Sequence, residues 1–176
     1  MLNATIFALT TGSLAHSPLI TVSNLHFSSY ACTFSYLFSS AIHSASKMKS
    51  FLADHTTFRN IIGTGIFLES KSYSNQVFED SLNEKSTKVI IQSCLFINCV
   101  STNGNGGGIQ ISMTSSSVEI SNTGITDCQS QSNGGAFYII SKEFSLNQCC
   151  IKSCSADEYD AFYYSNPNYA HEDEIK

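Results

Sequence analysis

The chain has 176 residues, of which 42% are hydrophobic and 13% charged, with two prolines and a formal net charge of −5. This length fits one domain, and the scarcity of charge and proline favours a β-rich repeat structure over a helical bundle. The whole excess of acid lies after Ala156, so the rest of the chain is neutral and offers no basic stripe for nucleic acid.

Residues 1–18 are the least regular part of the sequence. The apolar run 3–9 is short, is broken by Thr5 and follows no basic residue. It favours a partial first coil or an end cap over a signal peptide. No stretch of the sequence approaches the roughly 18 apolar residues that a transmembrane helix needs.

Residues 19–68 hold two degenerate copies of a repeat that is regular further on. Alternation of apolar and polar residues predicts three short strands in each copy. In the first copy the predicted strand positions are Ile20 and Val22, then Leu25 and Phe27, then residues 34–38, with Tyr30 in the inward column that Cys99 occupies later. The second copy runs over residues 51–61, with Ile61 in that column, and its third strand follows Gly65.

Residues 69–88 do not fit the repeat. The segment is polar and charged, and it lengthens the step between the equivalent residues Phe58 and Phe96 to 38 residues. We interpret it as a loop that leaves one corner. Because loops on a rigid scaffold often carry specific contacts, it is also a candidate binding determinant.

Residues 89–164 repeat one pattern three times. Equivalent positions fall into columns, which hold Cys99, Cys128 and Cys154; Phe96, Ile125 and Ile151; and Ile109, Phe137 and Phe162. Three short strands cannot bury an apolar face alone, so the copies must stack on one another. The sequence therefore predicts an all-β fold, a parallel β-helix (solenoid) of about five coils with the early coils degenerate. A leucine-rich repeat is the rival, but the apolar columns hold Val, Ile, Phe and Cys instead of Leu.

Small and polar residues mark the predicted corners. Gly107-Gly108, Gly135-Ala136 and Asp160-Ala161 precede the third strand, where a side chain would obstruct the neighbouring coil. A second, polar column follows an inward strand in each copy and holds Asn60, Asn98, Asp127 and Ser153. Asn and Asp tolerate left-handed backbone angles, so we interpret this column as a stacked turn ladder.

Residues 165–176 leave the pattern at Pro167 and are acidic. An exposed last coil would present unpaired strand edges. The tail is therefore a candidate cap for that end. Alternatively, the chain is a fragment of a longer solenoid, or it stacks end to end with another molecule.

Two motifs carry a resemblance to known proteins: Cys94-Leu-Phe-Ile-Asn-Cys99, followed by a glycine run, and Gly134-Gly-Ala-Phe-Tyr138. They resemble the GGA[I/L/V] and FxxN repeats of polymorphic outer-membrane-type surface proteins, and more closely the Cys-rich right-handed β-helix repeats of large surface proteins of protist parasites. Phe58–Asn60 and Phe96–Asn98 are one residue short of FxxN, and Asp160-Ala161 replaces the glycine pair. The resemblance covers about residues 51–164. It implies a right-handed pectin-lyase-like superfold and a surface or adhesin-like role.

The seven cysteines show neither metal-ligand spacing nor a Cys, His and acid set that the register brings together. Inward cysteines behave as small buried hydrophobes, and we favour free thiols for the column Cys99, Cys128 and Cys154. Disulfides between Cys128 and Cys154, or between Cys94 and Cys99, are the alternative in an oxidising compartment, because stacked strands are spaced suitably for a disulfide.

Outward positions of the third strand hold Phe67, Gln110, Tyr138 and Tyr163. Such a stripe suits a glycan or a protein partner on a flat solenoid face, although cross-strand pairing that stiffens the sheet explains it as well. We take Phe67, Tyr138 and Tyr163 as the candidate binding residues.

Outward positions of the first two strands in the regular copies carry only Glu119 and Lys152 as ionisable groups, on different faces. The sequence therefore predicts no catalytic residues, no metal and no cofactor. We expect a non-catalytic repeat module, adhesin-like or structural, that is extracellular or on a cell surface. A degenerate polysaccharide-active enzyme fragment, or a fragmentary gene product without a function of its own, are the alternatives.

Overall fold

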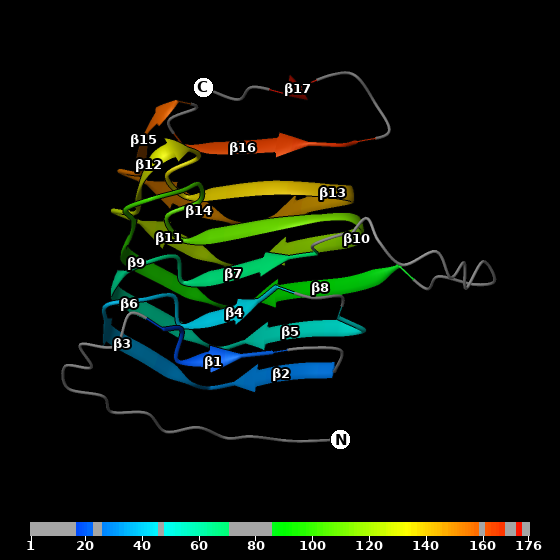
Figure 1. The fold of residues 1–176 in the computed structure, drawn as a ribbon, viewed down its shortest axis with the longest axis horizontal. Coiled ribbons are helices and arrows are strands. Elements are labelled where there is room, and N and C mark those ends of the chain that lie inside the picture. The colour runs from blue at the N-terminus through cyan, green and yellow to red at the C-terminus, as the bar shows by residue number, and fades with distance from the viewer. Residues whose placement is uncertain are drawn as a thin grey trace.

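The computed structural model describes residues 17–22, 26–45, 48–70, 86–158, 161–167 and 172–173. These residues form an all-β structure in which short strands wind around a common axis (Figure 1). Each strand hydrogen-bonds to its counterparts in the neighbouring turns. The chain is therefore a parallel β-solenoid, as the repeat pattern predicts.

Three faces run along the axis of the solenoid. The first face contains β2 (His26–Tyr30), β5 (Ser50–Asp54), β8 (Thr87–Gln92) and the second halves of β10 (Ile109–Ser121) and β13 (Phe137–Asn147). The second face contains β3 (Thr33–Leu37), β6 (Thr57–Ile62), β9 (Leu95–Ser101), β11 (Gly124–Thr126), β12 (Gln129–Asn133), β14 (Cys150–Lys152) and β15 (Ser155–Glu158). The third face contains β1 (Ile20–Thr21), β4 (Ile42–Ser44), β7 (Ile66–Glu69), the first halves of β10 and β13, β16 (Phe162–Ser165) and β17 (Glu172–Asp173).

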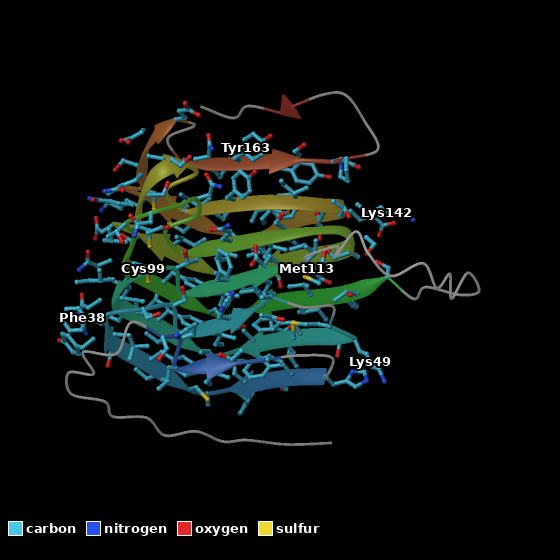
Figure 2. The ribbon with its side chains drawn as sticks, viewed as in Figure 1. Phe38, Lys49, Cys99, Met113, Lys142 and Tyr163 are labelled. Carbon is cyan, nitrogen blue, oxygen red and sulfur yellow. The ribbon has the colours of Figure 1, made fainter. Side chains whose placement is uncertain are left out.

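The pairing between described strands is parallel except at the C-terminal end. There β17 pairs antiparallel with β16. Strands β10 and β13 pass from the third face to the first, and β10 has an irregularity between Met113 and Ser117 at that bend. Met113 lies at this bend, to the right of Cys99 in the view of Figure 2.

The number of turns is slightly lower than expected. The inward column of the second face has five levels, occupied by Phe34, Phe58, Phe96, Ile125 and Ile151. Five levels span about four turns of the solenoid, whereas the repeat count predicts about five coils. The difference lies in the counting, because five stacked levels are separated by four steps along the axis.

The predicted register of the first copy is wrong. Ile20 pairs with Ile42 on the third face, and Phe27 pairs with Phe51 on the first face. The inward column of Cys99 continues through Ile61 to Leu37, and not to Tyr30. Alternation with period two does not distinguish one face from another. The register is instead consistent with aromatic stacking between turns, since the rings of Phe27 and Phe51 lie 5.2 Å apart. Leu25 lies outside the described residues.

The core is a set of vertical columns of like side chains. Phe34, Phe58 and Phe96 stack with ring centroids 5.2 and 4.6 Å apart, and all three are fully buried. On the third face Ile42, Ile66, Ile109 and Phe137 form the inward column, which is equally buried. Each buried side chain of this size stabilises the fold by about 1.5–3 kcal/mol, so the columns hold the turns together.

Other predicted segments fall partly outside the described residues. Residues 1–16, expected to be a partial coil or cap, lie outside them, as do residues 71–85 of the predicted loop. The C-terminal end of that loop is already strand, because β8 begins at Thr87. Of the predicted acidic tail, residues 172–173 form β17 and pair with the edge of β16.

Candidate functional site

The candidate binding residues lie in one row on the outside of the third face. In-register pairing places His43, Phe67, Gln110, Tyr138 and Tyr163 directly above one another. We call this row the outer column. It faces outward because it alternates with buried inward residues such as Ile109 and Ile111. Phe67, Tyr138 and Tyr163 therefore share a column, as predicted.

The outer column divides into two aromatic pairs. The rings of Tyr138 and Tyr163 stack with centroids 4.8 Å apart and planes at 10°, and Tyr163 lies near the C-terminal end (Figure 2). The rings of His43 and Phe67 are also 4.8 Å apart but tilted by 59°. Gln110 separates the pairs, so Phe67 is not adjacent to Tyr138. The repeat pattern does not place His43 in this column, because it predicts the wrong register for the first copy.

The polar turn ladder is confirmed at the second corner. Asn60, Asn98 and Asp127 have φ angles of 53°, 51° and 54°, in the left-handed region. The Asn98 Nδ2 group donates a hydrogen bond to Asn60 Oδ1 at 3.0 Å. Thr126 Oγ1 donates to Asp127 Oδ2 at 3.2 Å. The Asp127 carboxylate thus takes part in the turn, which is a structural role.

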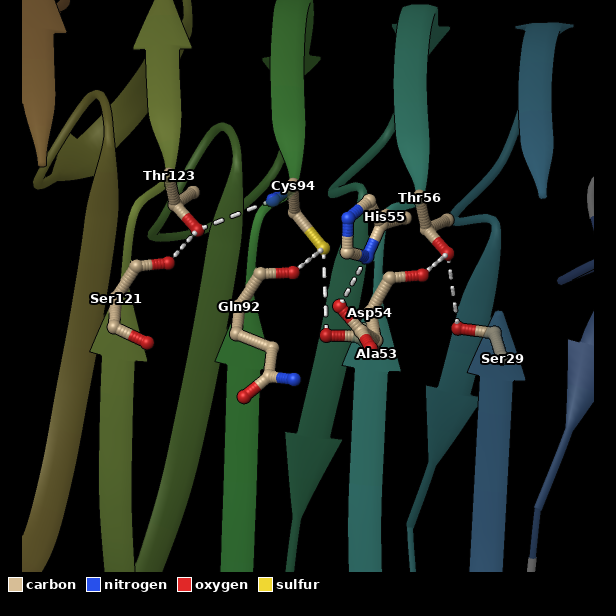
Figure 3. A network of polar contacts seen from close by, with 9 residues as sticks. All are labelled: Ser29, Ala53, Asp54, His55, Thr56, Gln92, Cys94, Ser121 and Thr123. Atoms are coloured by element: carbon tan, nitrogen blue, oxygen red, sulfur yellow. Dashed lines mark hydrogen bonds and ion pairs between the residues drawn. The ribbon is translucent and has the colours of Figure 1, made fainter. Parts of the chain in front are cut away.

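A second ladder at the first corner was not predicted. The residue that follows a left-handed position here is alternately a cysteine and a threonine, and this column consists of Cys32, Thr56, Cys94, Thr123 and Cys149. Each side chain donates to the carbonyl oxygen two residues earlier. The Thr123 hydroxyl also accepts a bond from the Cys94 backbone N–H at 3.4 Å (Figure 3). Thiol and hydroxyl therefore perform the same task at successive levels.

The three cysteines of the second corner behave in the same way. Cys99, Cys128 and Cys154 occupy consecutive levels, and each thiol contacts the carbonyl oxygen two residues earlier. The predicted inward column is confirmed, and all seven cysteines are free thiols. The hydrogen bond with the Cys154 thiol lowers the pKa of Cys128, but the interaction with the Cys99 thiol and burial outweigh it and raise this pKa to about 12.

The first corner also brings together a cysteine, a histidine and an acid, which the sequence analysis does not expect. His55 Nδ1 lies 2.6 Å from Asp54 Oδ1, in the level that precedes that of Cys94 along the chain (Figure 3). However, the Cys94 thiol points inward to the carbonyl oxygens of Ala53 and Gln92. Burial raises its pKa to about 12, which opposes formation of the thiolate nucleophile. This set therefore does not support nucleophilic catalysis.

An apolar groove on the second face was also missed. It has a volume of about 580 Å³ and is lined by Tyr36, Leu37, Phe38, Asn60, Ile61, Ile62, Asn98 and Val100. We call it the second-face groove. Tyr36 and Phe38 are 58% and 46% exposed. The two rings lie at the C-terminal end of β3, whereas Ile62 and Val100 belong to the next two levels. The groove therefore forms only when the levels stack, and no single strand indicates it in the sequence.

Within the described part of the chain, no group of three or more His, Cys, Asp or Glu side chains is placed to hold a metal ion. No helix among those residues is long and apolar enough to cross a membrane. Comparisons of the chain with protein-family models, with curated proteins and with solved structures find no match. The resemblance to repeat surface proteins therefore rests on the repeat motifs, and the structure supports its β-solenoid fold.

Proposed function

We propose that the chain is a non-catalytic β-solenoid module, adhesin-like or structural, within a cell-surface or secreted protein. It binds a glycan or protein partner through the outer column. The observation that carries the proposal is the in-register stack on the third face, which lines up aromatic side chains on a rigid sheet.

The chemistry of the outer column suits a sugar. A tyrosine ring offers an apolar face and a hydroxyl at its tip, and the carboxamide of Gln110 adds a donor and an acceptor at the next level. Sugar rings combine apolar C–H faces with hydroxyl groups that need hydrogen-bond partners. The stacked strands lie about 4.8 Å apart, so a partner meets one such group per turn without any movement of the backbone.

Several contacts support the absence of catalysis. Glu119 lies on the first face and Lys152 on the second, so they do not form a pair. Asp127 takes part in the turn ladder, and the thiol of Cys94 is buried and bonded to carbonyl oxygens. Glycoside hydrolysis by the usual route needs two carboxylates about 5–9.5 Å apart that flank the scissile glycosidic bond.

The test is a binding assay on the whole chain with a double variant, Tyr138→Ala with Tyr163→Ala. We expect binding to a responsive glycan or host surface to weaken by roughly tenfold or more, which corresponds to about 1.4 kcal/mol per factor of ten. The Tm should change by only a few degrees, because both rings lie outside the core. Binding is measured on a glycan array and on fixed cells, and stability by circular dichroism.

A matched variant, Tyr36→Ala with Phe38→Ala, removes two exposed rings from the second-face groove. Unchanged binding by this control supports the outer column. Loss of binding in the control alone moves the binding site to the groove. Release of reducing or unsaturated sugar from a polysaccharide by the wild-type chain contradicts the non-catalytic proposal.

A further inference from the structure

The two cysteine columns differ in one respect that matters for redox chemistry. In the second-corner column, Cys99, Cys128 and Cys154 occupy adjacent levels. In the first-corner column, Thr56 and Thr123 separate the cysteines. Adjacent levels lie about 4.8 Å apart, which falls within the range of Cα separations that a disulfide accepts, roughly 4.4–6.8 Å. Cysteines two levels apart, such as Cys94 and Cys149, are beyond that range.

Within the second-corner column, access singles out one pair. Cys99 and Cys128 are fully buried, whereas Cys154 is partly exposed at the C-terminal level. The Cys154 thiol also reaches toward the level of Cys128, since its Sγ lies 3.6 Å from the carbonyl oxygen of Ile125. A small oxidant therefore meets Cys154 first, and the nearest partner thiol is that of Cys128.

We propose that Cys128 and Cys154 form a modification site, which a low-molecular-weight disulfide converts to a disulfide bond between the last two levels. The Cys154 thiolate attacks the oxidant RSSR, which forms a mixed disulfide and releases one RSH. The Cys128 thiolate then attacks Cys154 Sγ and releases the second RSH. The two protein thiols lose two electrons and two protons, and RSSR is reduced to two RSH.

The bond joins the level that is held least firmly. Phe144, Cys149, Ile151 and Cys154 are partly exposed, whereas their counterparts one level earlier, Val118, Thr123, Ile125 and Cys128, are buried. In the closed level, the hydrogen bond to Cys128 and burial raise the pKa of Cys154, while the interaction with Cys99 and burial raise the pKa of Cys128. Opening of this last level exposes both thiols to water, which favours their thiolate forms, and gives Cys128 access to the mixed disulfide. Once formed, the bond closes a loop of about 26 residues and restricts that opening.

The experiment treats the purified whole chain with oxidised glutathione. All proteins carry Cys150→Ser, because the exposed thiol of Cys150 can link two molecules. We expect the intact mass to fall by the mass of two hydrogens, and a non-reducing peptide map to show Cys128 joined to Cys154. The Tm should rise by roughly 5–10 °C and return to its starting value with dithiothreitol.

Two further variants complete the test. Cys154→Ser changes a partly exposed residue, so it should fold, lose the mass change and lose the rise in Tm. Cys94→Ser, in the column where threonines intervene, should keep both. The proposal is overturned if the folded Cys150→Ser chain forms no intramolecular bond, or if the map shows a link other than Cys128 to Cys154. An unchanged Tm after complete oxidation overturns the role of the bond in restricting the last level.

Discussion

At the scale of single residues, the corners contain a repeated pair of consecutive residues. At every level of the first corner, and at the levels of Cys99, Cys128 and Cys154 in the second, a residue with φ near 50° is followed by a side chain that donates a hydrogen bond to the carbonyl two residues earlier. A left-handed conformation costs a non-glycine residue about 1–2 kcal/mol, so the donor that follows offsets part of this cost. At the first corner the left-handed positions are Ala31, His55, Ser93, Asn122 and Gln148. This unit gives a structural reason for the cysteine content of the chain.

Thr123→Val tests the first-corner unit. The hydroxyl of Thr123 donates to the carbonyl of Ser121 at 2.8 Å and accepts from the N–H of Cys94. Valine keeps the shape but leaves this N–H buried without its partner. The Ser121 oxygen keeps a second bond from the N–H of Ser93. We expect a loss of about 1–2 kcal/mol in the free energy of unfolding, measured by urea denaturation.

Thr123→Cys is the matched control, since cysteine occupies the same column at neighbouring levels. Under reducing conditions it should lose clearly less stability than Thr123→Val. If the two variants lose the same free energy of unfolding, the hydrogen bond is not the reason why this column holds cysteine and threonine.

At the scale of elements, the passage from the second face to the third depends on close backbone approach. A Cβ atom at Gly107 would lie 2.3 Å from the carbonyl oxygen of Gln129 and 2.5 Å from that of Gly135. Both atoms belong to the next turn, so the obstruction expected from the sequence is confirmed here. With a Cβ atom at Gly107, the strands of the two turns could pair only if one turn moved away from the other.

Gly107→Ala should therefore destabilise the fold by about 3 kcal/mol or more, because no side chain can move aside. Gly104→Ala provides the control in the same loop. There the nearest atoms to a new Cβ are side-chain oxygens at 3.6 and 3.7 Å, which is ordinary contact. Its free energy of unfolding should stay within about 0.5 kcal/mol of wild type in urea denaturation. Similar losses in both variants would contradict the proposed backbone clash.

At the scale of the whole molecule, the solenoid is nearly one-dimensional, because each level contacts mainly its neighbours. Stability is therefore expected to vary along the axis. Within the described residues, β14 and β15 pair with another strand on one side, whereas β9 pairs on both.

Hydrogen exchange should reveal this gradient. We expect the amides of β14 and β15 to exchange at least about tenfold faster than those of β9, because local opening begins where burial is lowest. Mass spectrometry of the reduced chain after timed exchange gives the rates. Uniform protection from β9 to β15 would show that the solenoid opens as a single unit.

Much of the fold follows from repeated residues. The columns of Cys99 and Phe96 predict the stacking of the later levels. The two columns are separated by the same number of residues in all three copies, which leaves one consistent register. The same columns predict that Tyr138 and Tyr163 lie one above the other. Where the copies diverge, this constraint weakens, and the first copy was placed on the wrong faces.

The sequence by itself determined the parallel stacking, the inward and outward faces of the later levels, and the position of the Asn ladder. Only the tertiary structure decided the register of the first level, the addition of His43 to the outer column, and the second-face groove. The physical reason is that alternation records which side of a strand is buried, whereas the identity of a face depends on contacts between turns. Those contacts join residues such as Phe34 and Phe58, which lie in neighbouring turns and are far apart in the sequence.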